Sequence, residues 1–192
     1  MGIRRVLMVA GWSLGTVAGG FAVFVAARQN RTHMAPALAI ATSSDPAVIE
    51  RGRYLVRRVA SCAGCHADPG QADAVARGDE TVPLSGGRRW QIPPGTFLAP
   101  NITSDPTTGA GTFTDGQIAS ALRHGIGHDG RALLPFMEMQ GLADDDLVAV
   151  VSYLRLEPAV RNTVPSHQIN FLGKVVIATI LAEPVGPKEP PP

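Results

Sequence analysis

Two cysteines and a histidine lie close together in the sequence Cys62-Ala63-Gly64-Cys65-His66. Two thiols about one helical turn apart can each add across one of the two vinyl groups on the edge of a porphyrin, and the next imidazole can reach the iron. The small Ala63 and Gly64 leave the space between the thiols clear. The spacing therefore predicts one covalently attached haem c, held by Cys62 and Cys65, with His66 as an iron ligand.

Two other uses of a Cys-x-x-Cys pair fit this sequence less well. A thioredoxin-type dithiol is expected within a βαβ pattern, which the surrounding sequence does not show, and it gives His66 no role. A structural zinc ion needs four ligands, and there is no second Cys-x-x-Cys or His pair to supply the others. A disulfide between these two cysteines would close too small a loop to stabilise the fold.

The second axial ligand of the iron has to come from another part of the chain. Met137 ends the apolar, proline-containing stretch 130–137, and a thioether raises the reduction potential, which suits an electron carrier. Met139 lies two residues further on, while His124 and His128 lie in a turn rich in glycine. A second imidazole would lower the potential. The sequence predicts Met137 as the distal ligand, with Met139 and His128 as the alternatives.

The composition indicates a loop-rich domain with few large packing groups. The 192 residues include 21 Gly and 16 Pro, but only 6 Phe, 2 Trp and 2 Tyr. The 17 Lys+Arg nearly balance the 16 Asp+Glu, and there is no basic run, which argues against a nucleic-acid binding protein. A haem would supply the large apolar body that the aromatic residues do not, so we expect folding to be coupled to haem attachment.

Three amphipathic helices are predicted, each with a start or stop signal in the sequence. Asp45 and Pro46 open the first, Gly125 ends the second and Pro158 stops the third. Their expected ranges are 45–60, 114–124 and 144–157. Residues 67–113 carry Gly and Pro every few positions without sustained strand alternation, so we expect a long loop that wraps the haem. The predicted fold class is all-α, a haem-wrapping domain with three main helices and long loops.

A membrane segment is predicted at the N-terminus. Residues 6–27 contain no ionisable side chain and exceed the roughly 20 residues that span a bilayer as a helix. Arg4 and Arg5 precede the segment and Arg28 follows it, so the local charge gives no strong orientation. The length favours an uncleaved transmembrane anchor over a signal peptide, and cleavage stays open.

The rest of the chain divides by composition. The expected parts are an N-terminal cytoplasmic stub at 1–5, the anchor or signal segment at 6–27, a linker at 28–44, the haem domain at 45–165 and a C-terminal extension at 166–192. Within the extension, residues 169–182 are apolar but too short for a second span. We expect a helix there, over the domain or on the membrane surface, followed by a proline-rich tail.

With these motifs the chain resembles a class I cytochrome c. More narrowly, it is similar to the haem domains of the membrane-bound cytochrome c subunits of bacterial alcohol, aldehyde and gluconate dehydrogenases. The similarity runs from Arg51 to about Pro165. The stretches that carry it are Gly52-Arg53-Tyr54-Leu55, Cys62-Ala63-Gly64-Cys65-His66, Leu84-Ser85-Gly86-Gly87, Gly95-Thr96, Ala99-Pro100-Asn101-Ile102-Thr103-Ser104-Asp105, Thr108-Gly109-Ala110-Gly111, Ala121-Leu122-Arg123-His124-Gly125, Asp129-Gly130-Arg131, Leu134-Pro135-Phe136-Met137, and Asp145-Asp146-Leu147 through Tyr153-Leu154-Arg155.

The resemblance implies His66 as the proximal and Met137 as the distal iron ligand. It also implies that the first and last helices cross at a right angle, with Gly52 close to the third helix near Tyr153. The family usually follows the ligand methionine with proline, where this chain has Glu138. The dehydrogenase subunits carry three such domains, whereas this sequence has one Cys-x-x-Cys-His motif, so it resembles a single-haem relative.

Further polar residues are candidates for haem contacts. Asn101 and Thr103 are expected in a haem-adjacent turn, where they could donate to a propionate or fix the loop. His66 needs an acceptor for its other ring nitrogen, and a backbone carbonyl near Pro69 or Pro83 is the expected partner. The candidates for neutralising the propionates are Arg88, Arg89 and Arg123.

The expected function is a membrane-anchored monohaem cytochrome that passes single electrons between redox partners. The partners would be a dehydrogenase, an oxidase or another cytochrome, with the haem domain in the periplasm at the outer face of the bacterial inner membrane. No catalytic residue and no small-molecule substrate are expected. Two alternatives remain: a haem enzyme or sensor that reacts with peroxide or a small ligand, and a fixed electron-transfer subunit of a dehydrogenase or respiratory complex.

Overall fold

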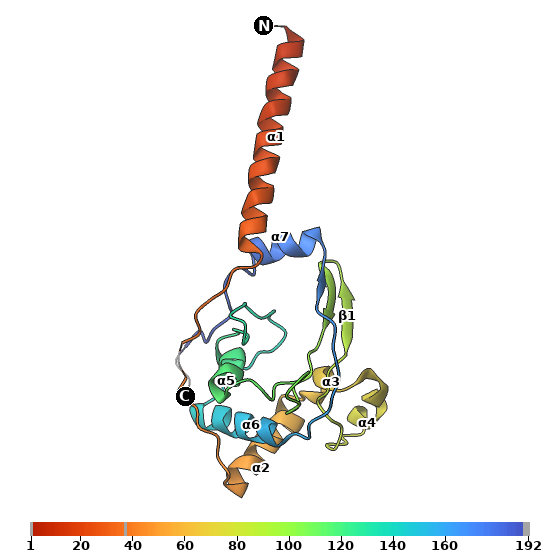
Figure 1. Cartoon of the computed structure of the whole chain (residues 1–192), viewed down its shortest axis with the longest axis vertical. Coiled ribbons are helices and arrows are strands. Elements are labelled where there is room, and N and C mark those ends of the chain that lie inside the picture. Colours follow the sequence, from red (N-terminus) through yellow and green to blue (C-terminus); the bar gives the residue numbers. More distant parts are fainter. Residues whose placement is uncertain (1, 37, 190–192) are drawn as a thin grey trace.

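The computed structural model describes residues 2–36 and 38–189 of the chain. Figure 1 shows one long helix, α1, standing away from a domain that contains the other elements. In chain order the elements are α1 (Ile3–Arg28), α2 (Pro46–Tyr54), a π-helical turn η1 (Leu55–Val59), α3 (Ala63–His66), a 3-10 turn η2 (Pro69–Gln71), α4 (Ala72–Ala76), β1 (Arg89–Ile92), β2 (Gly95–Leu98), α5 (Asp115–Arg123), α6 (Asp144–Leu156), β3 (Gln168–Ile169) and α7 (Phe171–Thr179).

The three predicted helices are confirmed as α2 with η1, α5 and α6. At the start of α2 the Asp45 carboxylate accepts a hydrogen bond from the Ala47 amide at 2.8 Å. A capping box opens α5, since the Thr114 hydroxyl accepts from the Gln117 amide and the Gln117 side chain accepts from the Thr114 amide. Three aspartates in the first turn of α6 favour the positive end of its dipole. The starts of these three helices are therefore determined by residues close to them in the sequence.

The predicted close approach of Gly52 to the third helix is also confirmed. A Cβ atom at Gly52 would overlap the backbone oxygen of Ala149 and lie 2.8 Å from the Cβ of Tyr153. Only glycine at this position lets the backbones of α2 and α6 approach this closely. The two helices pack together as the base of the domain.

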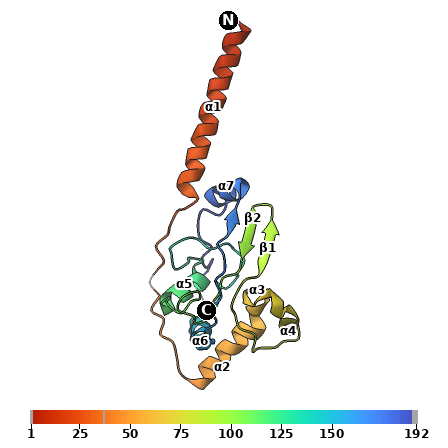
Figure 2. The same cartoon turned by 45° about the vertical axis from the view of Figure 1, so that its right-hand side comes forward.

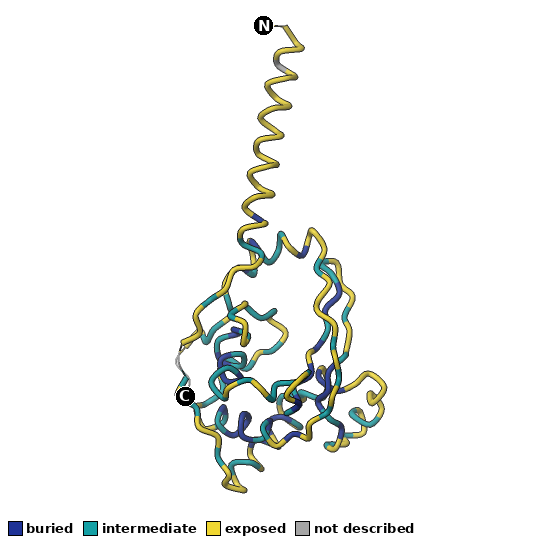
Figure 3. Tube along the Cα trace, in the orientation of Figure 1, coloured by how far each residue is buried: buried dark blue, intermediate teal, exposed yellow. Residues whose placement is uncertain are grey.

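The hydrophobic core is formed by residues of η1, α5 and α6 together with Leu84, and Figure 3 shows buried residues in dark blue in this part of the domain. Its side chains are small or medium in size. The members with no exposed surface are Val56, Leu84, Ala119, Leu147 and Val151. Complete burial of one such Leu or Val contributes about 1.5–3 kcal/mol.

The expectation of an all-α fold is wrong for the middle of the chain. Strands β1, β2 and β3 form an antiparallel sheet in that order, and Trp90 pairs with Phe97 across the hairpin. The strands hold four, four and two residues, too few to show a clear alternation in the sequence. Residues 67–113 are therefore partly a hairpin and short helical turns, where we expected one long loop.

The linker predicted at 28–44 lies along the domain. Leu38 and Ile40 pack against the core, and the Ser43 amide donates to the Ser152 hydroxyl at 2.9 Å. The His33 amide donates to the Gly130 carbonyl at 2.7 Å. These contacts join the chain after α1 to α6 and to the loop that leads toward Met137.

Helix α7 packs against the end of α1 that is nearest the domain. Helix α1 is long and apolar enough to cross a membrane, and Figure 3 shows it almost entirely exposed. A helix is present within the apolar stretch 169–182 as α7, which lies across the end of α1 in Figures 1 and 2. The end of the predicted proline-rich tail, 190–192, lies outside the described residues.

Candidate haem site

The Cys-x-x-Cys-His motif forms a single helical turn just after η1. Ser61 has a φ of +48°, which turns the chain out of η1 before α3 begins. The His66 amide donates to the Cys62 carbonyl at 2.8 Å, so one turn separates the two thiols. Cys62 is half-buried and Cys65 exposed, and both are free thiols. This is the spacing that thioether bonds to two vinyl groups require.

Cys62 packs against the hydrophobic core, and this environment favours the protonated form of its thiol. Burial raises the pKa of its thiol to about 11, against the opposing charge of Arg57. Cys62 lies where η1 meets α3.

His66 is buried and already oriented as a metal ligand. Its Nδ1 lies 2.8 Å from the carbonyl oxygen of Pro100. A carbonyl can only accept, so Nδ1 carries the proton and Nε2 keeps its lone pair. Burial lowers the pKa of His66, which the bond to Pro100 partly opposes, and this favours the neutral ring that binds metals. With the two thiols, this donor set fits a covalently attached haem.

The predicted acceptor for His66 was the right kind of group at the wrong position. We expected a carbonyl near Pro69 or Pro83, and the structure uses Pro100, which follows β2. The Gly86 amide donates to the His66 carbonyl at 2.6 Å, and the Ile102 amide donates to the Leu84 carbonyl at 3.0 Å. Residues 84–87 thus lie between the motif and the segment that carries Pro100.

Asn101 and Thr103 are both buried and hydrogen-bonded within the protein. The Asn101 side-chain amide donates to the Val160 carbonyl at 2.8 Å, and its oxygen accepts from the amide and hydroxyl of Thr103 at 3.0 and 2.7 Å. The hydroxyl of Thr108 accepts another bond from Asn101 at 3.1 Å. In this arrangement the two residues fix the loop after Pro100, the second of their two expected roles.

The three candidate arginines are in different environments. The buried Arg123 donates to the Asp144 carboxylate and to the Leu142 carbonyl, both at 2.8 Å, and so ties α5 to the start of α6. Arg88 donates to the carbonyl of Gly64 inside the motif, and its guanidinium lies 5.6 Å from the ring centroid of Trp90. Arg89 is exposed at the start of β1. Arg88 is the arginine that contacts the motif directly.

Met137 lies in a loop that aromatic contacts attach to the sheet. The preceding Phe136 stacks on Trp90 with a centroid distance of 6.3 Å and meets Phe97 edge-on at 5.9 Å. The Gln140 side chain donates to the Met137 carbonyl at 3.0 Å. Met137 is half-buried, as is Met139 two residues further on.

The candidate histidines near this loop are held differently. The exposed ring of His128 stacks on Phe113 at a centroid distance of 4.0 Å, so one face of it is used in packing. His124 is half-buried, and its Nε2 has no hydrogen-bond partner within the described chain. Burial and the charge of Arg123 lower the pKa of His124.

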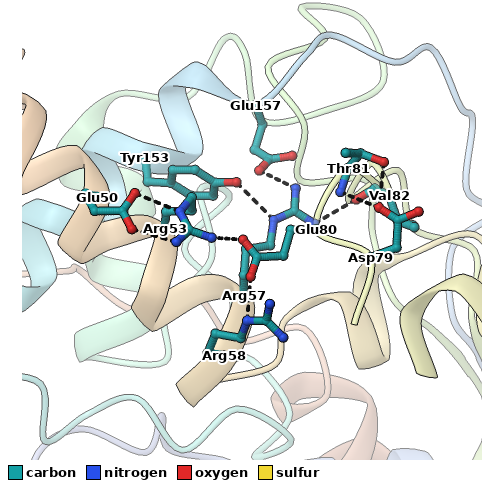
Figure 4. A network of polar contacts seen from close by, with 10 residues as sticks. All are labelled: Glu50, Arg53, Arg57, Arg58, Asp79, Glu80, Thr81, Val82, Tyr153 and Glu157. Carbon is teal, nitrogen blue, oxygen red and sulfur yellow. Dashed lines mark hydrogen bonds and ion pairs between the residues drawn. The ribbon is translucent and has the colours of Figure 1, made fainter. Parts of the chain in front are cut away.

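Sequence reasoning missed a buried ion pair beside the motif. Arg57 donates to Glu157 at 2.6 Å, to the Tyr153 hydroxyl at 3.0 Å and to the Val82 carbonyl at 2.7 Å (Figure 4). The side chains of Arg57 and Glu157 are only 4% and 1% exposed. Four basic residues occur on this one short helical stretch, so the sequence alone carries no signal that this one is inside.

Two thiols one helical turn apart, a buried neutral imidazole beside them and a core of crossing helices define a domain that holds haem c covalently. The chain belongs to the cytochrome c family, because the sequence profile of that family, described as cytochrome c, matches residues 49–156. Domains of this family bind haem c covalently, and the relatives that share the domain include a subunit named as the cytochrome c subunit of a dehydrogenase.

Known relatives confirm the narrower resemblance. The chain is 32% identical over 169 residues to one of the subunits of the nicotinate dehydrogenase of Pseudomonas putida, covering 83% of this chain and 13% of that protein. It is 34% identical over 149 residues to the cytochrome c subunit of the quinone alcohol dehydrogenase of Gluconobacter oxydans, covering 76% and 27%. A third relative, a diheme cytochrome c-type protein of Cereibacter sphaeroides, is 47% identical over 64 residues, covering 33% and 20%. The chain spans only about a quarter or less of the length of these relatives.

Proposed function

We propose that the chain is a membrane-anchored monohaem cytochrome c that passes single electrons between redox partners at the outer face of the bacterial inner membrane. The proposed site rests on one observation: the short segment 97–100 has contacts near both proposed iron ligands, His66 and Met137. At one end of it Phe97 contacts Phe136, the neighbour of Met137, and at the other end Pro100 holds His66. At 3.3 Å per residue, Phe97 and Pro100 are roughly 10 Å apart.

In this proposal His66 is the proximal ligand and Met137 the distal ligand. Pro100 fixes the tautomer of His66 and raises the basicity of its ligating nitrogen. The stacked Phe136 and the bond from Gln140 hold the backbone on both sides of Met137. Cys62 and Cys65 provide the two thioether attachments.

Bound haem c supplies the one-electron couple of its iron, and the chain sets the conditions for it. The rings of Trp90, Phe97 and Phe136 form an apolar cluster next to Met137 in the sequence. The guanidinium of Arg88, next to Gly64, offers a positive charge beside the attachment motif for a propionate. The contact with a redox partner is expected to be small and transient, as for other electron carriers.

The length of α1 supports membrane anchoring. This helix has 26 residues, and residues 6–27 of it carry no charge. Covalent haem attachment places the domain after α1 on the periplasmic side in this proposal. Retention of α1 in the mature protein is part of the same proposal, and a mass measurement tests it.

One Cys-x-x-Cys-His motif in the 192 residues supports one haem for this chain. The experiment is expression with the haem-attachment machinery, followed by intact mass and a pyridine haemochrome spectrum. We expect the mass of the chain plus one haem and a spectrum of haem c. A chain that weighs only its amino acids and lacks a Soret band would overturn the proposal.

Carbon monoxide separates the electron carrier from the enzyme or sensor alternative. A coordinated thioether resists displacement, so the reduced protein should keep its spectrum under carbon monoxide. Rapid formation of a carbonyl adduct at neutral pH would instead indicate an open sixth position. His128, the candidate base for such an open site, is stacked on Phe113.

A second candidate is a fixed electron-transfer subunit, because two of the relatives are named as dehydrogenase subunits. The partner would then be a dehydrogenase held in a permanent complex. Extraction of the native membrane with a mild detergent distinguishes the two. A dehydrogenase that stays with the cytochrome in stoichiometric amount supports the fixed subunit, and a cytochrome recovered alone supports the free carrier.

A further inference from the structure

The helix α7 and the residue after it leave three large apolar side chains on the surface. Phe171 is 66% exposed, Leu172 51% and Ile180 77%. Lys174 is the one charged residue between positions 170 and 181. A helix that faces water normally carries polar side chains on its outer face. The outer surface of α7 therefore has the composition of a surface that contacts an apolar phase.

The contacts between α7 and α1 indicate which apolar phase this is. The Arg28 side chain, at the end of α1, donates to the Ala178 carbonyl of α7 at 3.1 Å. Val25 is 3% exposed although its neighbours along α1 face outward, and Ala178 is fully buried. Glu183, just after α7, pairs with Arg31 at 2.5 Å. Helix α7 is thus packed on the last turn of the helix that we propose to span the membrane.

The level of this contact along α1 corresponds to the membrane interface. At 1.5 Å per residue the 26 residues of α1 are about 39 Å long, against roughly 30 Å for the hydrocarbon core. Val25 and Arg28 lie at the end of this length, where acyl chains give way to headgroups. In Figures 1 and 2 α7 crosses the direction of α1 steeply, so α7 lies close to the plane of the membrane when α1 spans it.

Polar contacts hold α7 rigidly on the haem domain. The Asn170 carboxamide oxygen caps α7 by accepting from the Gly173 amide at 3.0 Å, and its nitrogen donates to the Pro93 carbonyl at 2.6 Å. A Cβ at Gly173 would overlap the carbonyl of Pro94, so glycine allows α7 to rest on the β1–β2 turn. Strand β3, just before α7, pairs with β2. The orientation of α7 therefore fixes the orientation of the sheet.

We propose that the outer face of α7, formed by Phe171, Leu172 and Ile180, docks on the outer leaflet of the membrane and holds the haem domain in one orientation to the lipid surface. This inference rests on the proposed anchoring by α1. Lys174 and Arg28 lie at the level where phosphate headgroups attract basic side chains. Helix α3, with the attachment motif, is separated from α7 by the length of the β1–β2 hairpin, so the docked domain holds the motif away from the lipid surface (Figure 1).

The test uses the haem-loaded full chain, in which Cys62 and Cys65 are consumed, in vesicles of phosphatidylcholine and phosphatidylglycerol. A nitroxide is attached to one introduced cysteine at a time, in Leu172→Cys and Ile180→Cys. Val17→Cys, in the middle of α1, reports on the anchor, and Asp73→Cys, exposed on α4, is the aqueous control. Power saturation with oxygen and with a water-soluble nickel chelate measures the depth of each label. The Soret spectrum verifies that each variant is folded.

We expect the ratio of oxygen to nickel accessibility at Leu172 and Ile180 to be several-fold higher than at Asp73 and to approach that at Val17. Labels at Leu172 and Ile180 that are as accessible to nickel as the label at Asp73, with Val17 in lipid, would overturn the docking of α7 and leave the anchor standing. A label at Val17 that is in water would overturn the anchor itself, and the docking of α7 with it.

Discussion

His66 and Pro100 are joined by a hydrogen bond of 2.8 Å between the imidazole Nδ1 and the backbone carbonyl, across 34 positions of the chain. The carbonyl belongs to the segment that continues β2, and Gly86 packs directly against it. The sheet that the sequence did not reveal therefore orients His66, the proposed proximal ligand. Because this bond fixes the tautomer and the basicity of His66, a shift of Pro100 should alter the iron's potential.

Gly86→Ala is predicted to disturb this bond. The new Cβ would lie 2.5 Å from the carbonyl carbon and 2.6 Å from the oxygen of Pro100, and Gly86 has a φ of +77°, which other residues rarely adopt. We expect a loss of about 1–3 kcal/mol of stability from the backbone conformation. The displaced carbonyl should also shift the midpoint potential. Urea unfolding and a potentiometric titration measure the two effects.

Gly87→Ala is the matched control, because it separates backbone strain from movement of Pro100. Gly87 also has a positive φ, +104°, but a Cβ there would meet its nearest atom, in Pro69, at an ordinary 3.5 Å. We expect Gly87→Ala to lose stability and to keep the potential. Equal shifts of potential in the two variants would contradict the role given to Pro100.

Arg57→Ala is predicted to destabilise the fold strongly. It would leave Glu157, whose side chain is 1% exposed, without its cation, and the Oε2 atom of Glu157 already has no hydrogen-bond partner in the described chain. Removing one member of a buried ion pair costs about 3–5 kcal/mol. The free energy of unfolding from a denaturant titration measures the loss.

Arg53→Ala is the comparison for Arg57→Ala, one helical turn earlier. Arg53 pairs with Glu50 and Glu80, but its own side chain is 37% exposed. We expect a much smaller loss than for Arg57→Ala, because exposed ion pairs contribute little to stability. Similar losses in the two variants would mean that the Arg57–Glu157 pair is not buried in solution.

The elements that the sequence predicted well have their causes close by along the chain. The capping groups Asp45 and Thr114 lie within three residues of the amides that they bind. The Cys-x-x-Cys-His motif is also local, since its chemistry depends on one turn of helix. Gly52 was placed against Tyr153 from the family resemblance, and the packing of α2 on α6 confirms it.

The elements that the sequence did not predict depend on distant partners. Strands β1 and β2 are four residues each, and β3, which pairs with β2, is about 70 positions later. Without knowledge of that sheet, the sequence does not indicate which backbone carbonyl accepts the hydrogen bond from the His66 ring. The burial of Arg57 likewise depends on Glu157, 100 positions away, and neighbouring arginines on the same helix are exposed.

The carboxylate of Asp105 should make stability depend on pH. Hydrogen bonds from the side chain and amide of Thr108 and from the amide of Thr107 lower the pKa of Asp105 below its usual 3.8. A lowered pKa means that the charged form stabilises the fold above 3.8, and that this contribution is lost as the pH falls through the folded-state pKa. Asp105→Asn should therefore lower the melting temperature at neutral pH, and the difference should shrink in acid.

Melting temperatures of the wild type and Asp105→Asn between neutral pH and pH values below 3.8 test this. Asp145→Asn, an exposed aspartate in the first turn of α6, controls for the loss of one negative charge. A difference at Asp105 that stays constant down to the lowest pH would show that shape, and not charge, explains the effect of the variant.

Met137→Ala and Met139→Ala are a matched pair that identifies the distal ligand. Both side chains are half-buried and lie in the same loop, so general loosening of the loop should affect them alike. Loss of a coordinated thioether removes a ligand that favours Fe(II), so Met137→Ala should lower the midpoint potential by a sizeable part of the roughly 0.8 V range that axial ligands span. The reduced variant should also bind carbon monoxide.

We expect Met139→Ala to keep both the potential and the resistance to carbon monoxide. If Met139→Ala instead lowers the potential and lets carbon monoxide bind, Met139 is the distal ligand. It lies two residues after the Met137 carbonyl that accepts the bond from Gln140. His128→Ala completes the series: loss of its stacking on Phe113 should cost stability without a change of the iron's spectrum. If His128→Ala alone opened the iron to carbon monoxide, the second ligand would be an imidazole, and a lower potential in the wild type would follow from it.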